Sequence, residues 1–252
     1  MLRVDRATIS FGGIRAVESL SFQVLPREVF SIIGPNGAGK STVFNLISRI
    51  YDLDSGSIYL EGQELSGVPP HQVARRGVAR TFQNSELFVQ ETVLVNLLIA
   101  QQVHHHTTLW EEMLFLPRVR RQDLQFRERA EQVIDLLQLQ RYRREIVGSM
   151  PYGARKMVEI ARALCLEPKV LLLDEPSSGL NPEETEDLSF WIEDINRDLG
   201  ITVLMVEHDM NLVKQVSHRV LAMADGRFLA LGTPEEIQNH RSVQLAYIGC
   251  NA

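Results

Sequence analysis

The chain has 252 residues, of which 44% are hydrophobic and 23% are charged, so it can bury a substantial core as one large or two small domains. Its formal net charge of −6, without a strongly basic block, argues against a dedicated nucleic-acid binder. No apolar run approaches the roughly 18 residues that cross a bilayer, and the N-terminal stretch has no signal-like core, so we expect a chain that neither spans a membrane nor leaves the cell.

Apolar residues change their spacing along the chain, which predicts an alternation of strands and helices. In the first part, alternating or wholly apolar runs predict strands, and one longer stretch predicts a helix. These segments are strands near 2–11, 20–24, 29–33 and 57–60, turns at Gly12-Gly13 and 54–56, and a helix over 41–50.

The second part predicts an insertion followed by a return to the sheet. Amphipathic stretches predict helices, and two wholly apolar runs are typical of central parallel strands covered on both faces. The helices are expected near 89–140, 152–166 and 182–198, the apolar strands at 170–173 and 201–206, and short strands at 220–231 before a small terminal helix. This order predicts an α/β fold with a helical insertion between about residues 86 and 160.

The strongest motif follows the apolar run at 29–33 and meets the phosphate-loop pattern. Its residues are Gly34, Pro35, Asn36, Gly37, Ala38, Gly39, Lys40, Ser41 and Thr42. Glycines allow the backbone to curl so that its N–H groups point at phosphate oxygens, and the following helix directs its N-terminus at the same anion. Lys40 supplies a charge for the β- and γ-phosphates, and the Ser41 hydroxyl can bind Mg²⁺. A Gly-rich turn without function is the alternative, but the flanking strand and helix are the context that the motif demands.

Two acidic residues follow the apolar run at 170–173. Asp174 is expected at the carboxyl end of a buried strand, where it can hold Mg²⁺, and Glu175 is placed to accept a proton from an attacking water. Such a pair at a strand end is weak evidence alone and usually marks a strand-to-loop transition. Together with the phosphate loop, it predicts nucleotide hydrolysis.

Five features occur in the order found in ABC ATPases: the phosphate loop, Gln83, Tyr152-Gly153, Asp174-Glu175 and His208. The chain resembles this family over essentially its whole length. In that family two ATPase domains close face to face and trap ATP between the phosphate loop of one and the signature segment of the other.

The resemblance implies a single ABC ATPase domain over residues 1–252. Residues 1–85 and 161–252 would form a RecA-like core with a parallel sheet, together with an antiparallel β subdomain. Residues 86–160 would form a helical subdomain that carries the signature segment, and residues 232–252 a C-terminal tail.

The resemblance also implies roles for single residues. Phe11 and Val17 would bind the nucleotide, Phe11 by stacking on adenine. Glu175, His208 and Gln83 would be catalytic, and the Mg²⁺ ligands would be Ser41, Gln83 and Asp174. Gln83 would also border the surface that contacts the transmembrane subunits. Ser178-Gly179-Leu180-Asn181 would cross between the two nucleotide sites.

A closer resemblance is to the importers of branched-chain amino acids. It rests on Arg80-Thr81-Phe82-Gln83, on residues 92–98, on Val158-Glu159-Ile160-Ala161-Arg162, on residues 178–182 and on the tail at 231–249. It implies ATP as substrate and Mg²⁺ as cofactor, at the cytoplasmic face of a bacterial inner membrane. The implied partners are a second ABC ATPase subunit, permease subunits and, indirectly, a solute-binding protein. ATPases that serve urea or other amides share much of the pattern, so the solute stays open.

The signature segment departs from the general family, which has a Ser-Gly-Gly-Gln type sequence. Here the places hold Pro151, Tyr152, Gly153 and Ala154. Proline lacks the hydroxyl that would reach the partner's γ-phosphate, although it suits a helix start and is familiar in the amino-acid importer branch. We expect a weak signature that a partner ATPase compensates. Ordinary drift at a tolerant position is the alternative.

The sequence disfavours three other classes of protein. A soluble ABC ATPase that acts on ribosomes or DNA usually has two ATPase halves or a long coiled coil, and the sequence has neither. A P-loop kinase or GTPase lacks a Tyr-Gly segment between phosphate loop and Asp-Glu strand. An exporter ATPase is disfavoured by the residues around Gln83 without being excluded.

Two further features are interpreted as structural. Cys165, among apolar neighbours in a predicted helix, is expected to be buried and reduced. Three adjacent histidines, His104-His105-His106, cannot all face one ion, so a solvated loop is favoured over a metal site.

Overall fold

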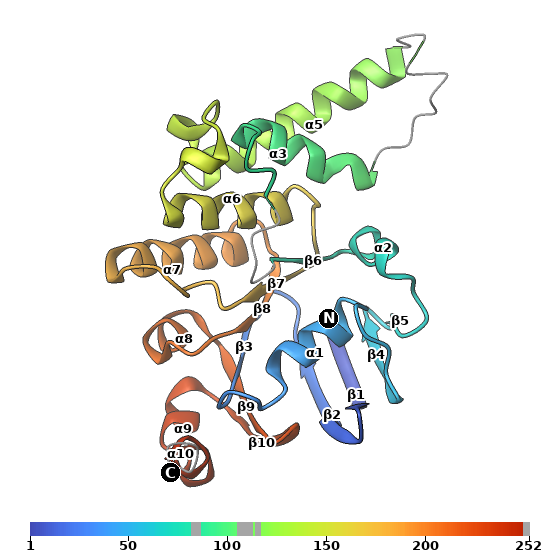
Figure 1. Cartoon of the computed structure of the whole chain (residues 1–252), viewed down its shortest axis with the longest axis vertical. Helices are drawn as coiled ribbons and strands as arrows, with labels where there is room; N and C mark the ends of the chain where they lie inside the picture. Colours follow the sequence, from blue (N-terminus) through green and yellow to red (C-terminus); the bar gives the residue numbers. More distant parts are fainter. Residues whose placement is uncertain (82–86, 105–112, 114–116, 249–252) are drawn as a thin grey trace. The chain divides into compact units, whose positions relative to one another are not determined.

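The computed structural model describes residues 1–81, 87–104, 113 and 117–248 and divides into two compact units. One, which we call the sheet unit, comprises Met1–Arg80 and Lys169–Ala252. The other, the helical unit, comprises Thr81–Pro168. Following the colours of Figure 1, the chain leaves the sheet unit after β6 and re-enters it at β7. The helical unit is therefore an insertion into the sheet unit.

The first sheet is antiparallel and confirms the strands expected near the N-terminus. Its strands are β1 (Leu2–Phe11), β2 (Ile14–Val24), β4 (Ser55–Leu60) and β5 (Gln63–Glu64), in the order β2-β1-β4-β5. The turn between β1 and β2 is Gly12-Gly13, as expected. Gly56, expected in a turn, is instead part of β4, because β4 begins at Ser55 and pairs with β1 from there.

The second sheet has six strands in the order β10-β9-β3-β8-β7-β6. Its strands are β3 (Val29–Ile33), β6 (Val78–Arg80), β7 (Val170–Asp174), β8 (Thr202–Val206), β9 (Arg219–Ala224) and β10 (Arg227–Gly232). The pairings β3–β8, β3–β9, β7–β8 and β6–β7 are parallel, and β10 is antiparallel to β9. Every residue of β3, β7 and β8 is buried, as the wholly apolar runs predict.

The helices of the sheet unit follow its strands. They are α1 (Lys40–Ile47), α2 (Pro70–Val73), the 3₁₀ turn η1 (Ala74–Arg76), α7 (Pro182–Arg197), α8 (Met210–Val216), α9 (Pro234–Gln238) and α10 (Arg241–Ile248). Helix α1 ends earlier than expected, because Arg49 adopts a left-handed conformation with φ 61°. Helix α8 was not predicted from the sequence. It begins where the Asp209 carboxylate caps the N–H groups of Asn211 and Leu212.

The core of the sheet unit is built around α1. This helix contacts β2 of the first sheet and β7 of the second. Phe44 of α1 is fully buried there, and the rings of Phe22 and Phe30 stack with centroids 5.6 Å apart. Burying a side chain such as Phe44 contributes about 1.5–3 kcal/mol. Both sheets are thereby anchored to the helix that follows the phosphate loop.

The helical unit contains α3 (Val93–Ala100), α5 (Pro117–Leu136) and α6 (Tyr152–Leu164), with 3₁₀ turns η2 (Gln101–His104), η3 (Gln140–Tyr142) and η4 (Val147–Ser149). Cys165 follows α6 and is buried, as expected, and burial raises the pKa of its thiol to about 12. The His104 imidazole lies 3.0 Å from the carbonyl oxygen of Leu166, so this histidine has a structural contact. His105 and His106 lie outside the described residues.

Two negative findings apply to residues 1–81, 87–104, 113 and 117–248. Within these ranges, none of the helices combines the length and the apolar character that a membrane crossing requires. Over the same ranges, no group of three or more His, Cys, Asp and Glu residues is arranged to hold a metal ion.

The turn between β9 and β10 offers a test of how the sheet unit holds its phosphate loop. Asp225 and Gly226 both have positive φ, at 50° and 73°. The Gly226 N–H donates to the Ala38 carbonyl at 3.1 Å, and a Cβ added at Gly226 would lie 2.6 Å from the Ala16 carbonyl oxygen. Position 226 therefore favours glycine for two reasons: its left-handed backbone conformation and its close approach to the Ala16 carbonyl.

We expect Gly226→Ala to lower the free energy of unfolding by more than Gly62→Ala. Gly62 also has positive φ, at 80°, but an added Cβ there meets no atom within 4 Å. Gly62→Ala should cost about 1–2 kcal/mol for the left-handed backbone alone, and Gly226→Ala should add a steric cost of about 1–3 kcal/mol. Urea unfolding of the two variants measures the difference. Equal losses would show that the turn does not press on the Ala16 segment.

Candidate nucleotide site

Residues 34–42 connect buried strand β3 to helix α1, which is the context that the phosphate-loop motif requires. Gly39 is the N-cap of α1 with φ 93°, and an added Cβ there would lie 2.4 Å from the Ala16 carbonyl oxygen. Only glycine fits this position without displacing the Ala16 backbone. The loop borders a hollow of about 270 Å³ that is also lined by Ala16 and Glu175.

Lys40 is the first residue of α1, and its side chain reaches back to the beginning of the loop. Its ammonium group donates to the carbonyl oxygens of Gly34 at 2.8 Å and Pro35 at 3.0 Å. Burial lowers the pKa of Lys40, and the nearby carboxylates of Glu175 and Asp174 partly oppose that effect. A buried cation whose charged form is disfavoured gains from an anionic ligand. The loop is therefore suited to bind phosphate.

Asp174 ends β7 and is held by a guanidinium group. Arg80, at the end of the neighbouring strand β6, donates to Asp174 Oδ2 at 2.8 Å, and both side chains are buried. The other terminal nitrogen of Arg80 donates to Asn45 Oδ1 at 2.7 Å and Ser48 Oγ at 2.9 Å. Arg80 thus ties the strand-end carboxylate to α1, the helix that follows the phosphate loop.

The side chains of Glu175 and His208 contact each other, which the sequence alone does not show. Glu175 follows β7, and His208 follows β8, the strand paired with it. His208 Nε2 lies 2.8 Å from Glu175 Oε1, with side-chain exposures of 39% and 18%. Glu175 has φ 48°, a conformation that costs an ordinary residue roughly 1–2 kcal/mol and is often kept at functional sites.

Phe11 and Val17 lie in different surroundings. Phe11 ends β1 and is 43% exposed, and its ring meets that of Tyr51 edge to face with centroids 5.0 Å apart. Its exposed face is therefore open to a stacking ligand. Val17 is fully buried in the core, next to Ala16, which lines the hollow.

The remaining predicted site residues fall elsewhere. Gln83 lies outside the described residues. In the helical unit, Pro151 is the N-cap of α6, Tyr152 is its first residue and is 47% exposed, and Gly153 is buried. Proline suits this helix start, as expected. Ala154 is half-buried in the first turn. The segment 178–181 ends in Asn181, which forms a capping box with Glu184 at the start of α7.

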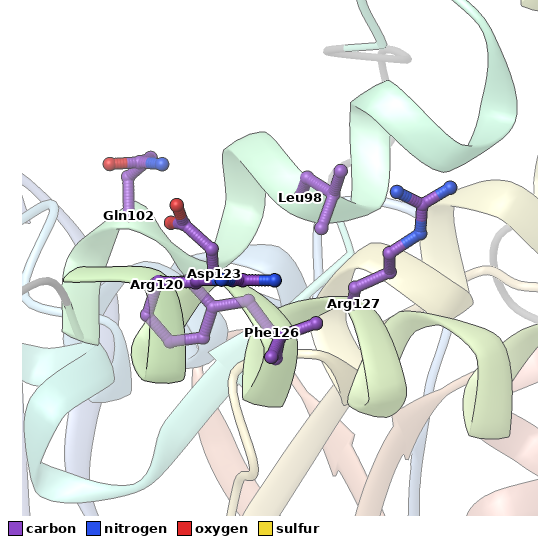
Figure 2. A pocket seen from close by; sticks show the side chains of 7 residues that line it. Leu98, Gln102, Arg120, Asp123, Phe126 and Arg127 are labelled. Carbon is purple, nitrogen blue, oxygen red and sulfur yellow. The ribbon is translucent and has the colours of Figure 1, made fainter. Parts of the chain in front are cut away.

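A second hollow, of about 300 Å³, lies in the helical unit between α3 and α5. Figure 2 shows Leu98 of α3 on one side, with Arg120, Asp123 and Arg127 of α5 on the other. Its lining mixes both signs of charge with apolar side chains, and none of the predicted site residues in the described ranges borders it. The candidate site is therefore the hollow at the phosphate loop.

Three residues near the site were not recognised from the sequence as parts of it. Arg80 belongs to a motif quoted for the family resemblance, but no role was predicted for it, and it contacts Asp174. Tyr51 contacts Phe11. Glu207 is almost fully buried between the loops that carry Glu175 and His208. A charged residue next to an apolar run, as Glu207 is to 201–206, was the available signal.

A glycine loop between a buried parallel strand and a helix, with a buried lysine and an acidic strand end beside it, defines a P-loop nucleotide-binding α/β protein. The model of the family described as ABC transporter matches residues 17–178. The chain therefore belongs to the ABC transporter family, and within it to the ATPase cassettes.

Relatives and a solved structure match the chain along nearly its whole length. It is 41% identical to the high-affinity branched-chain amino acid transport ATP-binding protein BraF of Pseudomonas aeruginosa, covering 99% of this chain and 98% of the relative. It is 40% identical, with the same coverage, to LivG of Escherichia coli K12, which carries the same description. The ADP conformation of MJ1267, an ATP-binding cassette of an ABC transporter, superposes with a TM-score of 0.85 at 28% identity, over 99% of this chain and 98% of that one.

Replacing Lys40 with alanine tests the loop. Removing one charge-assisted contact should lower the affinity for ATP roughly 10- to 100-fold, because such a contact contributes about 1.5–3 kcal/mol. Lys169→Ala is the control, because Lys169 is half-exposed and pairs with Glu61 instead. Titration of a fluorescent ATP analogue measures both affinities. Unchanged affinity in the Lys40 variant would contradict the assignment of the site.

Proposed function

We propose that this chain hydrolyses ATP as a subunit of an importer, and that hydrolysis drives the uptake of amino acids, branched-chain or other hydrophobic ones. The observation that carries the hydrolytic part is the shared hollow at the phosphate loop, where Lys40 and Glu175 face the same space. The identity of 40–41% to BraF and LivG, over whole chains, supports the choice of solute class.

ATP binds with its phosphates in the loop 34–42 and its adenine against Phe11. Backbone N–H groups and the N-terminus of α1 attract the phosphates. Lys40 exchanges the carbonyl oxygens of Gly34 and Pro35 for phosphate oxygens, so its burial no longer opposes its charge. The Arg80 contact keeps the Asp174 carboxylate fixed at the end of β7.

Mg²⁺ fits the oxygen donors that the chain offers. Ser41 lines the hollow, and the buried Asp174 precedes Glu175, which lines it too. A hydroxyl and one carboxylate suit an ion that keeps several waters and binds substrate phosphates, and Gln83 would complete the set. When bound, the ion neutralises phosphate charge.

Glu175 orients the attacking water and takes its proton, while His208 and Lys40 stabilise charge on the transferring phosphoryl group. The contact between His208 and Glu175 aligns the two side chains before nucleotide arrives. In the complex His208 turns its imidazole toward the γ-phosphate, and Glu175 is then available to the water.

The chain works at the cytoplasmic face of a bacterial inner membrane, together with a second ATPase subunit, permease subunits and, indirectly, a solute-binding protein. The signature segment at 151–154 acts on the nucleotide of the partner ATPase. Pro151 at the N-cap offers no side-chain hydroxyl there, so Gly153 and the helix N-terminus supply a weak attraction of about 0.3–1 kcal/mol. The partner's own signature compensates.

Glu175→Gln separates binding from hydrolysis. We expect ATP affinity to change less than about threefold and the turnover rate to fall by roughly 100-fold or more, because an amide cannot accept the water proton. Glu184→Gln is a matched control, since glutamine also supports a capping box. Phosphate release measures the rates. Wild-type turnover in the Glu175 variant would remove this residue from the role of base.

Uptake by the whole transporter tests the solute. The chain is purified from membranes with its bound subunits and reconstituted in vesicles with the solute-binding protein added outside. We expect uptake of labelled leucine that requires internal ATP and is lost with Glu175→Gln. Uptake of urea or an amide in place of leucine would contradict the proposed solute class and leave the ATPase role intact.

A further inference from the structure

Glu207 is a buried carboxylate that the proposed mechanism does not use. It directly follows β8 and is 1% exposed. Among the described residues no lysine or arginine pairs with it, and its contacts are backbone N–H groups. An ionisable group this deep requires compensation from its surroundings. Its partners therefore indicate what it does.

The carboxylate joins two loops that are far apart in sequence. Oε1 accepts the N–H of Ser177, in the loop after β7, at 2.8 Å. Oε2 accepts the N–H groups of His208 at 2.8 Å and Asp209 at 3.2 Å, in the loop after β8. One side chain thereby holds both loops at a fixed separation, at the edge where β7 and β8 of Figure 1 end.

Both loops carry a member of the hydrolytic pair. Glu175 lies two residues before Ser177 in one loop, and His208 is the residue next to Glu207 in the other. The side chains of the pair meet at 2.8 Å, so a shift of either backbone would separate them. The N–H of Glu175 also donates to the Val206 carbonyl at 2.9 Å, which fixes the beginning of its loop but not the segment beyond.

We infer that Glu207 is a positioning residue for the Glu175–His208 pair, because it connects the loop 176–181 to the backbone of His208. It acts through backbone contacts and touches neither nucleotide nor water. This inference rests on the proposed function, because it presumes that the pair performs hydrolysis. It adds a specific consequence: a change at Glu207 alters turnover without altering nucleotide binding.

Glu207→Gln is the first test, because glutamine has the same shape but only one acceptor oxygen. One of the two loops then loses its acceptor and faces an N–H donor. We expect the turnover number to fall by about tenfold or more, since small misplacements of reacting groups can cost up to about 100-fold. KM and the affinity for ATP should stay within about threefold of the wild type.

A matched control separates position from stability. Glu28 is also buried, at 5% exposure, and accepts the N–H of Leu25 and the guanidinium group of Arg219, but it precedes β3 at the opposite edge of the sheet. Glu28→Gln should lower the thermal unfolding midpoint, because it also weakens the contact with Arg219, and leave turnover unchanged. An equal loss of turnover in both variants would overturn the inference.

A double-mutant cycle tests the path through His208. In a His208→Ala background, one of the two groups that Glu207 aligns is absent, so Glu207→Gln should lower turnover by less than about threefold. The same tenfold loss in both backgrounds would overturn the inference while leaving the role of His208 intact. If His208→Ala itself had no effect, the proposed role of His208 would fail instead.

Glu207→Asp covers the case in which the Gln variant does not fold. Aspartate keeps both oxygens but is one methylene shorter, so it reaches one loop and not both. Turnover should fall with ATP affinity retained, and Glu28→Asp should have no effect on turnover. Full turnover in Glu207→Asp would contradict the inference.

Discussion

The parallel pairing of β7 with β8 is the constraint on which the site depends. Asp174 is the register partner of Val206, and the Glu175 N–H donates to the Val206 carbonyl at 2.9 Å. Because the strands are parallel, the loops that follow β7 and β8 begin at the same edge of the sheet. Glu175 therefore contacts His208, although 33 positions separate them in the sequence. Ligands of open α/β sheets bind outside the carboxyl ends of the strands, and this edge follows that rule.

The charged groups around the hollow already have partners within the protein. Lys40 donates to its own loop, Asp174 accepts from Arg80, and Glu207 accepts backbone N–H groups. Buried charges without such contacts would cost several kcal/mol each. These contacts therefore compensate the buried charges from within the protein itself.

Local sequence pattern predicted the elements with strong periodicity or wholly apolar composition. Strand β3 lies where the run at 29–33 placed it, and β7 and β8 differ from expectation by one residue at an end. Strand β6 was not predicted because its few residues, 78–80, show no periodicity, and α8 was not predicted because it is short. The contact of Arg80 with Asp174 spans 94 residues, so only the pairing of β6 with β7 reveals it. Likewise, an acidic residue after an apolar strand indicates only the beginning of a loop. The burial of Glu207 is what distinguishes it from an ordinary loop residue.

The contacts of Lys40 have a consequence for discrimination among small molecules. An ammonium group that is already anchored to two carbonyl oxygens has given up most of its rotational freedom, which for lysine amounts to as much as about 2 kcal/mol. A ligand must therefore offer oxygens that accept hydrogen bonds from Lys40 at least as strongly as the two carbonyl oxygens that it replaces. Phosphate chains do so through their charge, whereas a nucleoside offers the lysine only neutral acceptors. The contacts of Lys40 thus favour phosphate-bearing ligands over uncharged ones.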